Sequence, residues 1–274
     1  MNGRLLIAGG NIGATEQGKR DILGRFTALS GGKRGKILVI PCASGNPVDS
    51  AQYICEEFLA AGIGVTVTLP LTEDPDLLKG RWTHRADEKL FPLFDGVTGV
   101  WFTGGDQLRT ARLLLEPDGS DTPVLQKIRS VLDRGGVVGG TSAGAAIMSR
   151  TMIARGDEAG VLTLPRYPSL EGYTDSETIP EPLVLTRGLG FLPFGIVDQH
   201  FNRRPRLQRL LAAMELSGES LGWGISEDTA LEADLTAGTL RVLGSAYVVR
   251  ALQTGSGVTL DQYTAAEEAV KINL

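Results

Sequence analysis

Short apolar runs alternate with amphipathic stretches over most of the chain, and this alternation limits how the chain can fold more than any other feature. Several of the runs end in glycine or proline, which is typical of buried strands that stop at tight turns. Strands that alternate with helices usually form a parallel sheet with helices on both faces. The sequence therefore predicts a three-layer α/β sandwich with a mostly parallel central sheet. The runs that predict its strands are Arg4–Ala8, Lys36–Ile40, Val65–Leu69, Val97–Phe102, Val137–Gly139, Gly195–Val197 and Trp223–Ile225.

Between these runs, apolar residues at helical spacing predict helices at Ser50–Ala61, Gln107–Leu115 and Val124–Leu132. After about residue 228 the pattern changes, and consecutive runs predict antiparallel strands at Thr229–Ala233, Thr239–Leu243 and Ala246–Leu252. No linker-like break, internal repeat or low-complexity segment interrupts the pattern, so residues 1–274 are expected to form one α/β domain. The Pro-rich segment 162–187 has little periodicity and is expected to be a long loop, a feature that is often functional in compact domains.

Composition narrows the classes of function. The 274 residues carry a net charge of −5, which is not typical of a protein that binds nucleic acid. The two cysteines, Cys42 and Cys55, and the two histidines do not have the spacing of zinc ligands, so no metal is expected. No apolar run reaches the length of a signal-peptide core or a membrane span, which predicts a cytoplasmic protein without a membrane partner.

The segment from Gly139 to Ala146 carries the strongest chemical signal. It contains the pattern Gly-x-Ser-x-Gly at Gly140, Ser142 and Gly144, between an apolar strand and the alanine-rich start of a helix. That context is the one in which a nucleophile elbow holds an exposed serine on a tight strand-to-helix turn. Backbone N–H groups at the start of the helix can stabilise an oxyanion there. Ser142 is therefore the predicted nucleophile.

A serine nucleophile needs a base and an acid that orients the base. His84 lies in a polar, surface-like stretch, whereas His200 follows an apolar run, where the strand ends of an open α/β sheet form a ligand crevice. His200 is thus the predicted base. Glu227 follows another short run and is the predicted acid. The carboxylates that compete with it are Asp157, Glu158, Asp198 and Asp228.

Two further features accompany these residues. A second glycine turn at Phe102–Gln107 ends a strand and opens a helix, so its backbone is expected to complete the oxyanion hole; the predicted contributors are Gly105, Asp106 and Ala143. Four arginines follow His200 in an otherwise acidic chain. They either form a solvated helix face or bind carboxylates through paired hydrogen bonds; they are Arg203, Arg204, Arg206 and Arg209.

Four blocks carry a resemblance to a known family. They are GGTSAGAAIMS at 139–149, WFTGGDQL at 101–108, DQHFNRRPRLQRL at 198–210 and GISEDTA at 224–230. Together they resemble the cyanophycinases, serine peptidases of the group that also includes aspartyl dipeptidase (peptidase E). The elbow is shared by many hydrolases, whereas the Asp-Gln-His-Phe block with its spaced arginines is far more discriminating. The resemblance implies a flavodoxin-like three-layer sandwich, similar to class I glutamine amidotransferases.

The resemblance also implies an activity. The substrate would be cyanophycin, a poly-aspartate backbone with arginine on each β-carboxyl, and an exopeptidase would release β-aspartyl-arginine dipeptides from it. Ser142, His200 and Glu227 match the nucleophile, the base and the orienting acid. The family's substrate pocket matches Gln107, Asp198, Gln199, Arg204, Arg206 and Arg209. The family needs no metal or other cofactor, and its members are usually homodimers.

Two alternatives stay open. The first is an aspartyl dipeptidase that cleaves short Asp-X or isoaspartyl peptides. The second concerns the acid, because the related dipeptidases place one shortly after the elbow, which would be Asp157 or Glu158 here. The 162–187 segment is longer than the family pattern leads us to expect, so it is a candidate for altering the choice of substrate.

Overall fold

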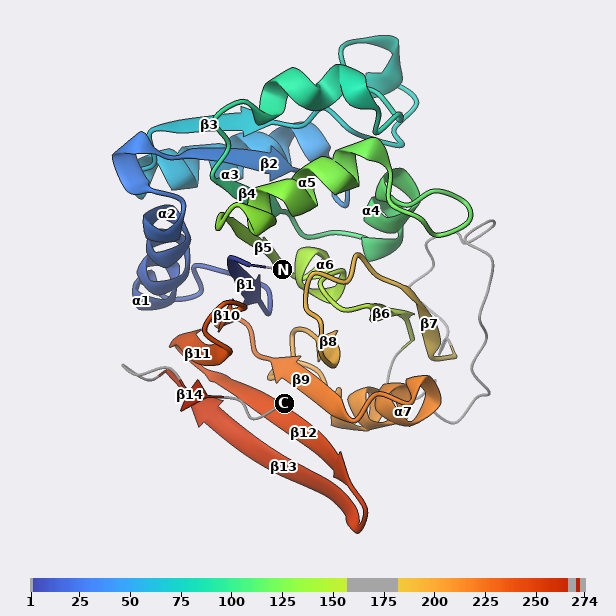
Figure 1. The fold of residues 1–274 in the computed structure, drawn as a ribbon. Coiled ribbons are helices and arrows are strands. Elements are labelled where there is room, and N and C mark those ends of the chain that lie inside the picture. Colours follow the sequence, from blue (N-terminus) through green and yellow to red (C-terminus); the bar gives the residue numbers. More distant parts are fainter. Residues whose placement is uncertain (1, 157–181, 266–269, 272–274) are drawn as a thin grey trace.

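The computed structural model describes residues 2–156, 182–265 and 270–271. Its main sheet has eight strands in the order β14-β11-β10-β1-β5-β4-β2-β3 (Figure 1). Strands β1 to β5 run parallel, and β10, β11 and β14 pair antiparallel. The predicted α/β class, with antiparallel strands towards the C-terminus, is confirmed. The strands are β1 (Arg4–Ala8), β2 (Lys36–Ile40), β3 (Val65–Thr68), β4 (Gly99–Phe102), β5 (Val137–Thr141), β10 (Thr229–Asp234), β11 (Thr239–Gly244) and β14 (Val270–Lys271).

The alternation of side chains along each strand divides the core into two layers. In β4, Trp101 packs on one face with Phe26 and Phe58, whereas Val100 and Phe102 pack on the other with the buried leucines of two helices. One face is covered by α1 (Glu16–Lys19), a π-helical turn at Arg20–Gly24, α2 (Arg25–Leu29) and α3 (Pro47–Ala60). The other is covered by α4 (Gln107–Leu114), α5 (Pro123–Asp133) and α6 (Ala143–Ala146).

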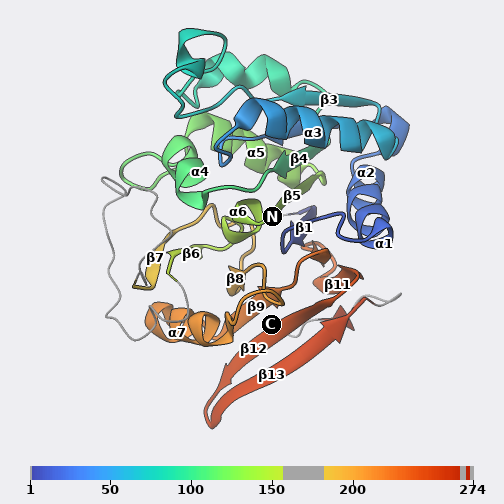
Figure 2. The same cartoon turned by 180° about the vertical axis from the view of Figure 1, so that it is seen from behind.

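A second sheet, in the order β13-β12-β9-β8, lies beside the main one (Figure 2). Its parallel pair β8–β9 contacts α6 and β10 and so adjoins the middle of the main sheet. Its other side packs on α7, whose buried residues include Leu210 and Met214. The elements are β8 (Ile196–Asp198), β9 (Leu221–Ile225), β12 (Tyr247–Thr254), β13 (Gly257–Thr264) and α7 (Leu207–Ser217).

Two sequence-based expectations need correction. The three C-terminal runs do not form one meander, because the chain turns at Gly244, with φ 98°, and β12 then pairs with β9 and β13 instead of β11. The expected long loop at 162–187 is wrong for its last residues: Val184–Arg187 forms β7, whose first two residues are buried, and pairs with β6 (Thr151–Arg155). Most of that segment, residues 157–181, lies outside the described residues.

The chain leaves two neighbouring strands of the main sheet in opposite directions, an arrangement that creates a crevice. From β2 the chain passes through α3 to β3 at the edge of the sheet. From the neighbouring β4 it passes through α4 and α5 to β5, in the opposite direction. In open α/β sheets such a reversal separates the loops at the carboxyl ends of the two strands. Within the described part of the chain, no helix is both long and apolar enough to cross a membrane.

Candidate active site

Ser142 sits on the tight turn between β5 and α6. Its φ of 55° and ψ of −112° are strained for a residue with a side chain. The glycines around it permit the turn: a Cβ on Gly140 would lie 2.7 Å from the Gly144 carbonyl oxygen, and one on Gly144 would lie 2.5 Å from that of Phe102. The close approaches at Gly140 and Gly144 therefore make the Gly-x-Ser-x-Gly spacing a steric requirement of this turn.

His200 meets Ser142 from the second sheet. The distance between Ser142 Oγ and His200 Nε2 is 2.8 Å. The histidine follows β8, and its backbone N–H donates to the Gly9 carbonyl at 2.7 Å. Gly10 packs on the ring so closely that a Cβ there would lie 2.3 Å from His200 Cε1. The loop after β1 thus fixes the imidazole against the serine.

Glu227 completes the arrangement from the turn between β9 and β10. His200 Nδ1 lies 2.7 Å from Glu227 Oε1, so the ring donates its Nδ1–H to the carboxylate and leaves Nε2 to accept the serine proton. The other carboxylate oxygen, Oε2, accepts from Asn11 Nδ2 at 3.1 Å. The structure thus brings Ser142, His200 and Glu227 together. Asp157 and Glu158, the alternative acids, lie outside the described residues.

Burial and hydrogen bonding have opposite effects on the pKa of His200 and on that of Glu227, and the balance differs between the two groups. Burial lowers the pKa of His200 from its ordinary value of 6.5 and outweighs the hydrogen bond from the ring to Glu227, which raises it. For Glu227, burial raises the pKa, but the hydrogen bonds from His200 and Asn11 outweigh it, and the net pKa is lowered. Near neutral pH the pair is therefore a neutral imidazole beside a carboxylate, the state in which the ring can accept a proton.

The pH profile of catalysis should reflect this shift. We expect kcat/KM to rise with pH along a limb centred below 6.5, because the lowered pKa keeps His200 neutral to lower pH than an exposed histidine. Initial rates measured over about five pH units, from about pH 4 to about pH 9, would define the limb. A limb centred above 7 would contradict the assignment of His200 as the base.

Asn11 is the residue of this site that the sequence analysis missed. It has φ 43°, in the left-handed region, and lies on the loop after β1. The Asp228 carboxylate holds that loop, accepting from Gly13 N at 2.9 Å and from Thr15 Oγ1 at 2.6 Å. The sequence signal available was Gly-Gly-Asn directly after a strand, which indicates a tight turn without revealing its distant partner.

Asn11→Gly tests whether this amide orients Glu227. Glycine adopts the same φ without strain, so the variant removes only the hydrogen bond. We expect kcat to fall roughly ten-fold, the effect of losing one hydrogen bond to a charged group, while the melting temperature changes little. Steady-state kinetics and thermal melting provide the measurement. Unchanged kcat would mean that Asn11 serves only the backbone turn.

Backbone strain is concentrated here. The described non-glycine residues with positive φ are Asn11, Ser142, His200 and Asp228, and all four lie in or next to this arrangement. Each such conformation costs on the order of 1–3 kcal/mol and persists only where its surroundings enforce it. Their collection in one place is the mark of a functional site.

The three predicted contributors to the oxyanion hole differ in whether their backbone N–H groups already donate a hydrogen bond. Gly104 approaches the nucleophile closely, since a Cβ there would lie 3.3 Å from Ser142 Cβ. The Asp106 N–H, however, donates to the Ala43 carbonyl at 2.9 Å. Among the described backbone hydrogen bonds, none uses the N–H of Gly105 or Ala143. These two groups are therefore the predicted donors that stay available.

The predicted pocket residues differ in burial and in their hydrogen-bond partners. Arg203 and Arg204 are exposed, and Arg203 Nε lies 3.4 Å from Glu227 Oε2. Arg209 and Asp198 are buried and form a paired ion bridge, with Nε to Oδ2 at 2.9 Å. Arg206, also buried, donates to both the backbone oxygen and the side chain of Gln199 and lies 3.4 Å from Asp198. Gln107 donates to the backbone carbonyls of Ile153 and Ala154 in β6, at 3.0 and 2.6 Å.

Breaking the buried ion bridge between Arg209 and Asp198 should lower the stability of the fold. We expect Asp198→Asn to lower the free energy of unfolding by about 3–5 kcal/mol, because the buried Arg209 guanidinium loses its paired carboxylate. Urea unfolding gives the measurement, and Asp95→Asn, at an exposed position, is the matched control. An unchanged midpoint for Asp198→Asn would show that the pair contributes nothing to the fold.

Cys42 is a buried thiol, and its pKa decides whether it can act as a nucleophile. Burial raises the pKa of the Cys42 thiol to about 12, so this cysteine is not a thiolate at neutral pH. Among the residues that the structure describes, no group of three or more histidine, cysteine, aspartate or glutamate side chains is arranged to hold a metal ion.

The fold and the site define a three-layer α/β protein with a serine–histidine–glutamate arrangement at the carboxyl edge of its sheet. The chain belongs to peptidase family S51, whose family model matches residues 5–239. It is 36% identical over 228 residues to the cyanophycinase of Synechococcus elongatus, covering 82% of this chain and 61% of that protein. It is 32% identical over 259 residues to the cyanophycinase of Trichormus variabilis, covering 93% of this chain and 76% of that protein.

The alignment with the Synechococcus protein thus spans about three fifths of that protein's length. Among solved structures, a peptidase from an acI-B1 actinobacterium has the same fold, with a TM-score of 0.65 and 22% sequence identity. The similarity covers 99% of this chain and 98% of the other. At this identity, the likeness establishes the fold.

Proposed function

We propose that this chain is a serine exopeptidase that hydrolyses cyanophycin to β-aspartyl-arginine dipeptides. One observation carries the proposal: Ser142 Oγ lies 2.8 Å from His200 Nε2, and His200 Nδ1 lies 2.7 Å from Glu227 Oε1. That geometry suits acyl transfer through a serine. Membership of family S51 and the similarity to named cyanophycinases support the choice of substrate.

In the proposed mechanism, Ser142 Oγ attacks the scissile carbonyl carbon while its proton passes to His200 Nε2. The carbonyl oxygen becomes an oxyanion that accepts hydrogen bonds from the N–H groups of Gly105 and Ala143. The C–N bond then breaks, and the leaving amine takes the proton from His200. Water, deprotonated by His200, hydrolyses the acyl-enzyme and restores the serine hydroxyl. Glu227 stabilises the imidazolium formed in each half of the cycle.

The proposed substrate pocket lies beside this centre. Arg204 is exposed and free of the buried ion bridge, so we propose that it contacts a substrate carboxylate directly. Arg206, Arg209 and Asp198 form the buried network beneath, which supports Gln199 at the end of β8. Gln107 ties α4 to β6 and forms the adjoining wall.

Product identification tests the function. The purified protein is incubated with cyanophycin and, separately, with Asp-X and isoaspartyl dipeptides, and the products are analysed by mass spectrometry. We expect β-aspartyl-arginine from the polymer and little release from the short peptides. Cleavage of the short peptides alone would instead favour an aspartyl dipeptidase, and no cleavage of either would overturn the proposal.

The proposal also covers the domain organisation, the oligomeric state and the location of the protein in the cell. We expect residues 1–274 to act as one domain, as a homodimer and in the cytoplasm, as the resemblance and the sequence pattern suggest. Light scattering of the purified protein measures the oligomeric state, limited proteolysis the domain organisation, and cell fractionation the location. A monomer, separable folded fragments or a membrane fraction would each contradict the corresponding point.

A further inference from the structure

Asp228, the last residue of the turn between β9 and β10, carries a carboxylate that is buried among neutral groups. The residue is 2% exposed, and none of the ion pairs between described residues involves it. Its side chain accepts from Gly13 N at 2.9 Å, Thr15 N at 3.1 Å, Thr15 Oγ1 at 2.6 Å and Ser245 Oγ at 2.8 Å. Burying an acid without a cation is costly, so Asp228 points to a role other than stability.

The hydrogen bonds of this carboxylate require an acceptor at both of its oxygens. Gly13 N donates to Oδ1 and Thr15 N donates to Oδ2. A backbone N–H can only donate, and the NH₂ group of an asparagine cannot accept. An asparagine at position 228 would therefore place its NH₂ against one of these two N–H groups in either orientation. Aspartate thus has the chemistry that the position needs, whereas a side chain of the same shape does not.

The backbone of Asp228 is held as well. The residue follows Glu227 directly, and its carbonyl accepts from Ser245 N at 2.9 Å, in the turn before β12. Its φ of 52° lies in the left-handed region, which a residue with a side chain keeps only where its surroundings enforce it. The neighbour of the candidate acid is therefore fixed at its backbone and at its side chain.

Asp228 also holds the loop after β1 at two points, one on each side of Asn11. Asp228 N donates to the Gly10 carbonyl at 2.9 Å, and Asp228 Oδ1 accepts from Gly13 N at 2.9 Å. Asn11 and Gly13 are exposed, so these two residues depend on hydrogen bonds more than on packing for their position. The conformation of the loop around Asn11 is therefore determined largely by Asp228.

This part of the loop contacts both partners of Ser142. Gly10 packs on the His200 ring, where a Cβ on the glycine would lie 2.3 Å from Cε1. Asn11 Nδ2 donates to Glu227 Oε2 at 3.1 Å. A shift of the loop would change the contacts of the base and of the acid together, and small misplacements of catalytic groups lower the rate strongly.

We propose that Asp228 is a positioning residue of this site: it fixes the loop after β1 and thereby aligns the base and the acid with Ser142. Its carboxylate hydrogen-bonds to the loop and to the turn before β12, and it acts on His200 and Glu227 through the loop. The inference rests on the proposed function, because alignment matters only if Ser142 is the nucleophile. Loss of a positioning residue lowers the rate of the chemical step, whereas loss of a merely structural residue lowers stability alone.

Asp228→Asn tests the proposal, because it keeps the size of the side chain and turns one acceptor into a donor. We expect kcat for cyanophycin to fall about 10²-fold, while KM changes less than about three-fold. The rate at which a serine-directed phosphonate labels Ser142 should fall in parallel, and this rate reports on the nucleophile without the polymer. An unchanged kcat and an unchanged labelling rate in a folded Asp228→Asn protein would overturn the proposal.

Glu232 provides the matched control for stability. It lies on β10, is 5% exposed, and its carboxylate accepts from Arg25 Nε and Nη2, each at 2.7 Å. Glu232→Gln should lower the melting temperature and leave kcat unchanged, because its described hydrogen bonds do not reach the loop after β1. If Glu232→Gln lowers kcat as much as Asp228→Asn at a similar melting temperature, the effect is one of stability and the inference is wrong.

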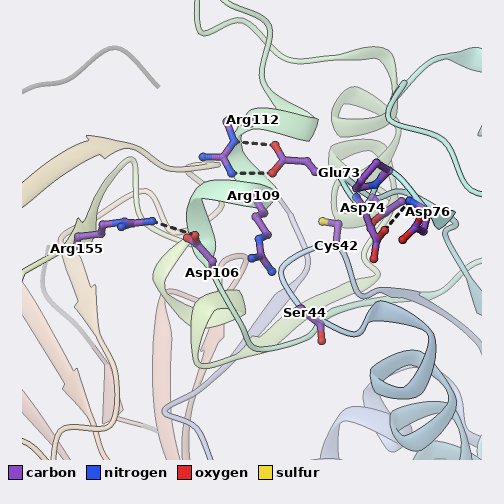
Figure 3. Close-up of a pocket in the computed structure, with 12 residues that line it drawn as sticks. Cys42, Ser44, Glu73, Asp74, Asp76, Asp106, Arg109, Arg112 and Arg155 are labelled. Carbon is purple, nitrogen blue, oxygen red and sulfur yellow. Dashed lines mark hydrogen bonds and ion pairs between the residues drawn. The ribbon is translucent and has the colours of Figure 1, made fainter. Parts of the chain in front are cut away.

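A second control comes from another loop at the same edge of the sheet. Glu73 follows β3 and lines a cavity of about 510 Å³, where it accepts from Arg112 Nε and Nη2, each at 2.7 Å (Figure 3). Among the described residues that line this cavity, none belongs to the serine–histidine–glutamate arrangement. Glu73→Gln should therefore keep wild-type kcat, and a loss comparable to that of Asp228→Asn would contradict a specific role for Asp228.

A double-mutant cycle with Asn11→Gly shows whether Asp228 acts through the loop. The two single variants should lower kcat about ten-fold and about 10²-fold, and the double variant about 10²-fold, because the loss at Asn11 is already contained in the loss at Asp228. A fall of about 10³-fold, the product of the two effects, would show that Asp228 acts independently of the loop.

Thr15→Val takes the place of Asp228→Asn if the latter does not fold. It keeps the shape of the side chain and removes the hydroxyl that donates to Asp228 Oδ2 at 2.6 Å. We expect kcat to fall about three-fold or more, because one of the contacts that fix the loop is lost. Wild-type kcat in this variant would then overturn the proposal.

The outcomes distinguish this inference from the proposed function. If the wild-type protein does not cleave cyanophycin but Asp228→Asn slows labelling by the phosphonate, the proposed substrate is wrong and the positioning role remains. If the wild-type protein releases the dipeptide and the Asp228→Asn protein is as fast in both assays, the proposed function stands and the inference is wrong.

Discussion

Ser142→Ala should lower kcat at least ~10³-fold, because the variant loses covalent catalysis but keeps substrate binding and the proposed oxyanion donors. The alanine removes one oxygen from a position whose backbone is held by neighbouring glycines, and Ser142 N still donates to the Ala8 carbonyl. The fold should therefore be unchanged. Turnover of cyanophycin, measured by dipeptide release, is the primary readout.

A matched control is Ser120→Ala, at an exposed turn far from β5 in the sequence, which should keep wild-type activity. A serine-directed phosphonate should label the wild-type protein at Ser142 and leave the Ser142→Ala protein unlabelled. Near-wild-type turnover in Ser142→Ala would falsify the serine mechanism, whatever the substrate proves to be.

Glu227→Gln should lower kcat roughly 10²–10⁴-fold with a much smaller change in KM. The amide is nearly isosteric, but it carries no charge to stabilise the imidazolium. Its NH₂ group can also donate to His200 Nδ1, which favours the wrong tautomer and places a proton on Nε2. The hydrogen bond from Asn11 to the other oxygen position makes a full rotation of the side chain costly.

The comparison variant is Glu158→Gln, which should be close to wild type. This pair decides between the two acids that the sequence left open. A crippled Glu158 variant beside an active Glu227 variant would show that the acid comes from the segment just after the elbow. The rates of both should be measured at the same pH, above the limb expected for His200.

The positions of the candidate site residues could be predicted because they follow from strand ends. Ser142, His200 and Glu227 each come directly after a short apolar run, and the carboxyl ends of parallel strands meet at one edge. The structure places β8 and β9 in a separate sheet, yet these two strands still run parallel to each other. Their ends therefore remain together beside β5.

Contacts between distant residues could not be predicted from local pattern. Asn11 and Glu227 are 216 residues apart, and the pairing of β1 with β10 brings them together. The arginines after His200 show the same limit. Their spacing suggested that all four arginines share one role. In the structure Arg203 is exposed, whereas Arg209 is buried against Asp198. The difference arises because α7 begins at Leu207 and directs Arg209 into the core.

Secondary structure was missed where periodicity is interrupted. Residues 16–29 form α1, a π-helical turn and α2, but glycines at 18 and 24 weaken the helical pattern. At Gly18 the reason is tertiary, since a Cβ there would lie 2.2 Å from Asp228 Oδ2. By contrast, α7 carries leucine and methionine at helical spacing and could have been found from the sequence.

The position of β1 in the main sheet has a consequence for how the protein is made. Of the strands described, this one comes first along the chain, yet it pairs with β5 on one side and with β10 on the other, where Arg4 and Asp234 are 230 residues apart. Pairing between such distant segments is slow and waits for chain closure. Because Glu227 lies just before β10, a nascent chain still on the ribosome has the serine and the histidine before it has the acid. Hydrolytic activity is thus expected to arise only late in folding, after β10 has left the exit tunnel and paired with β1.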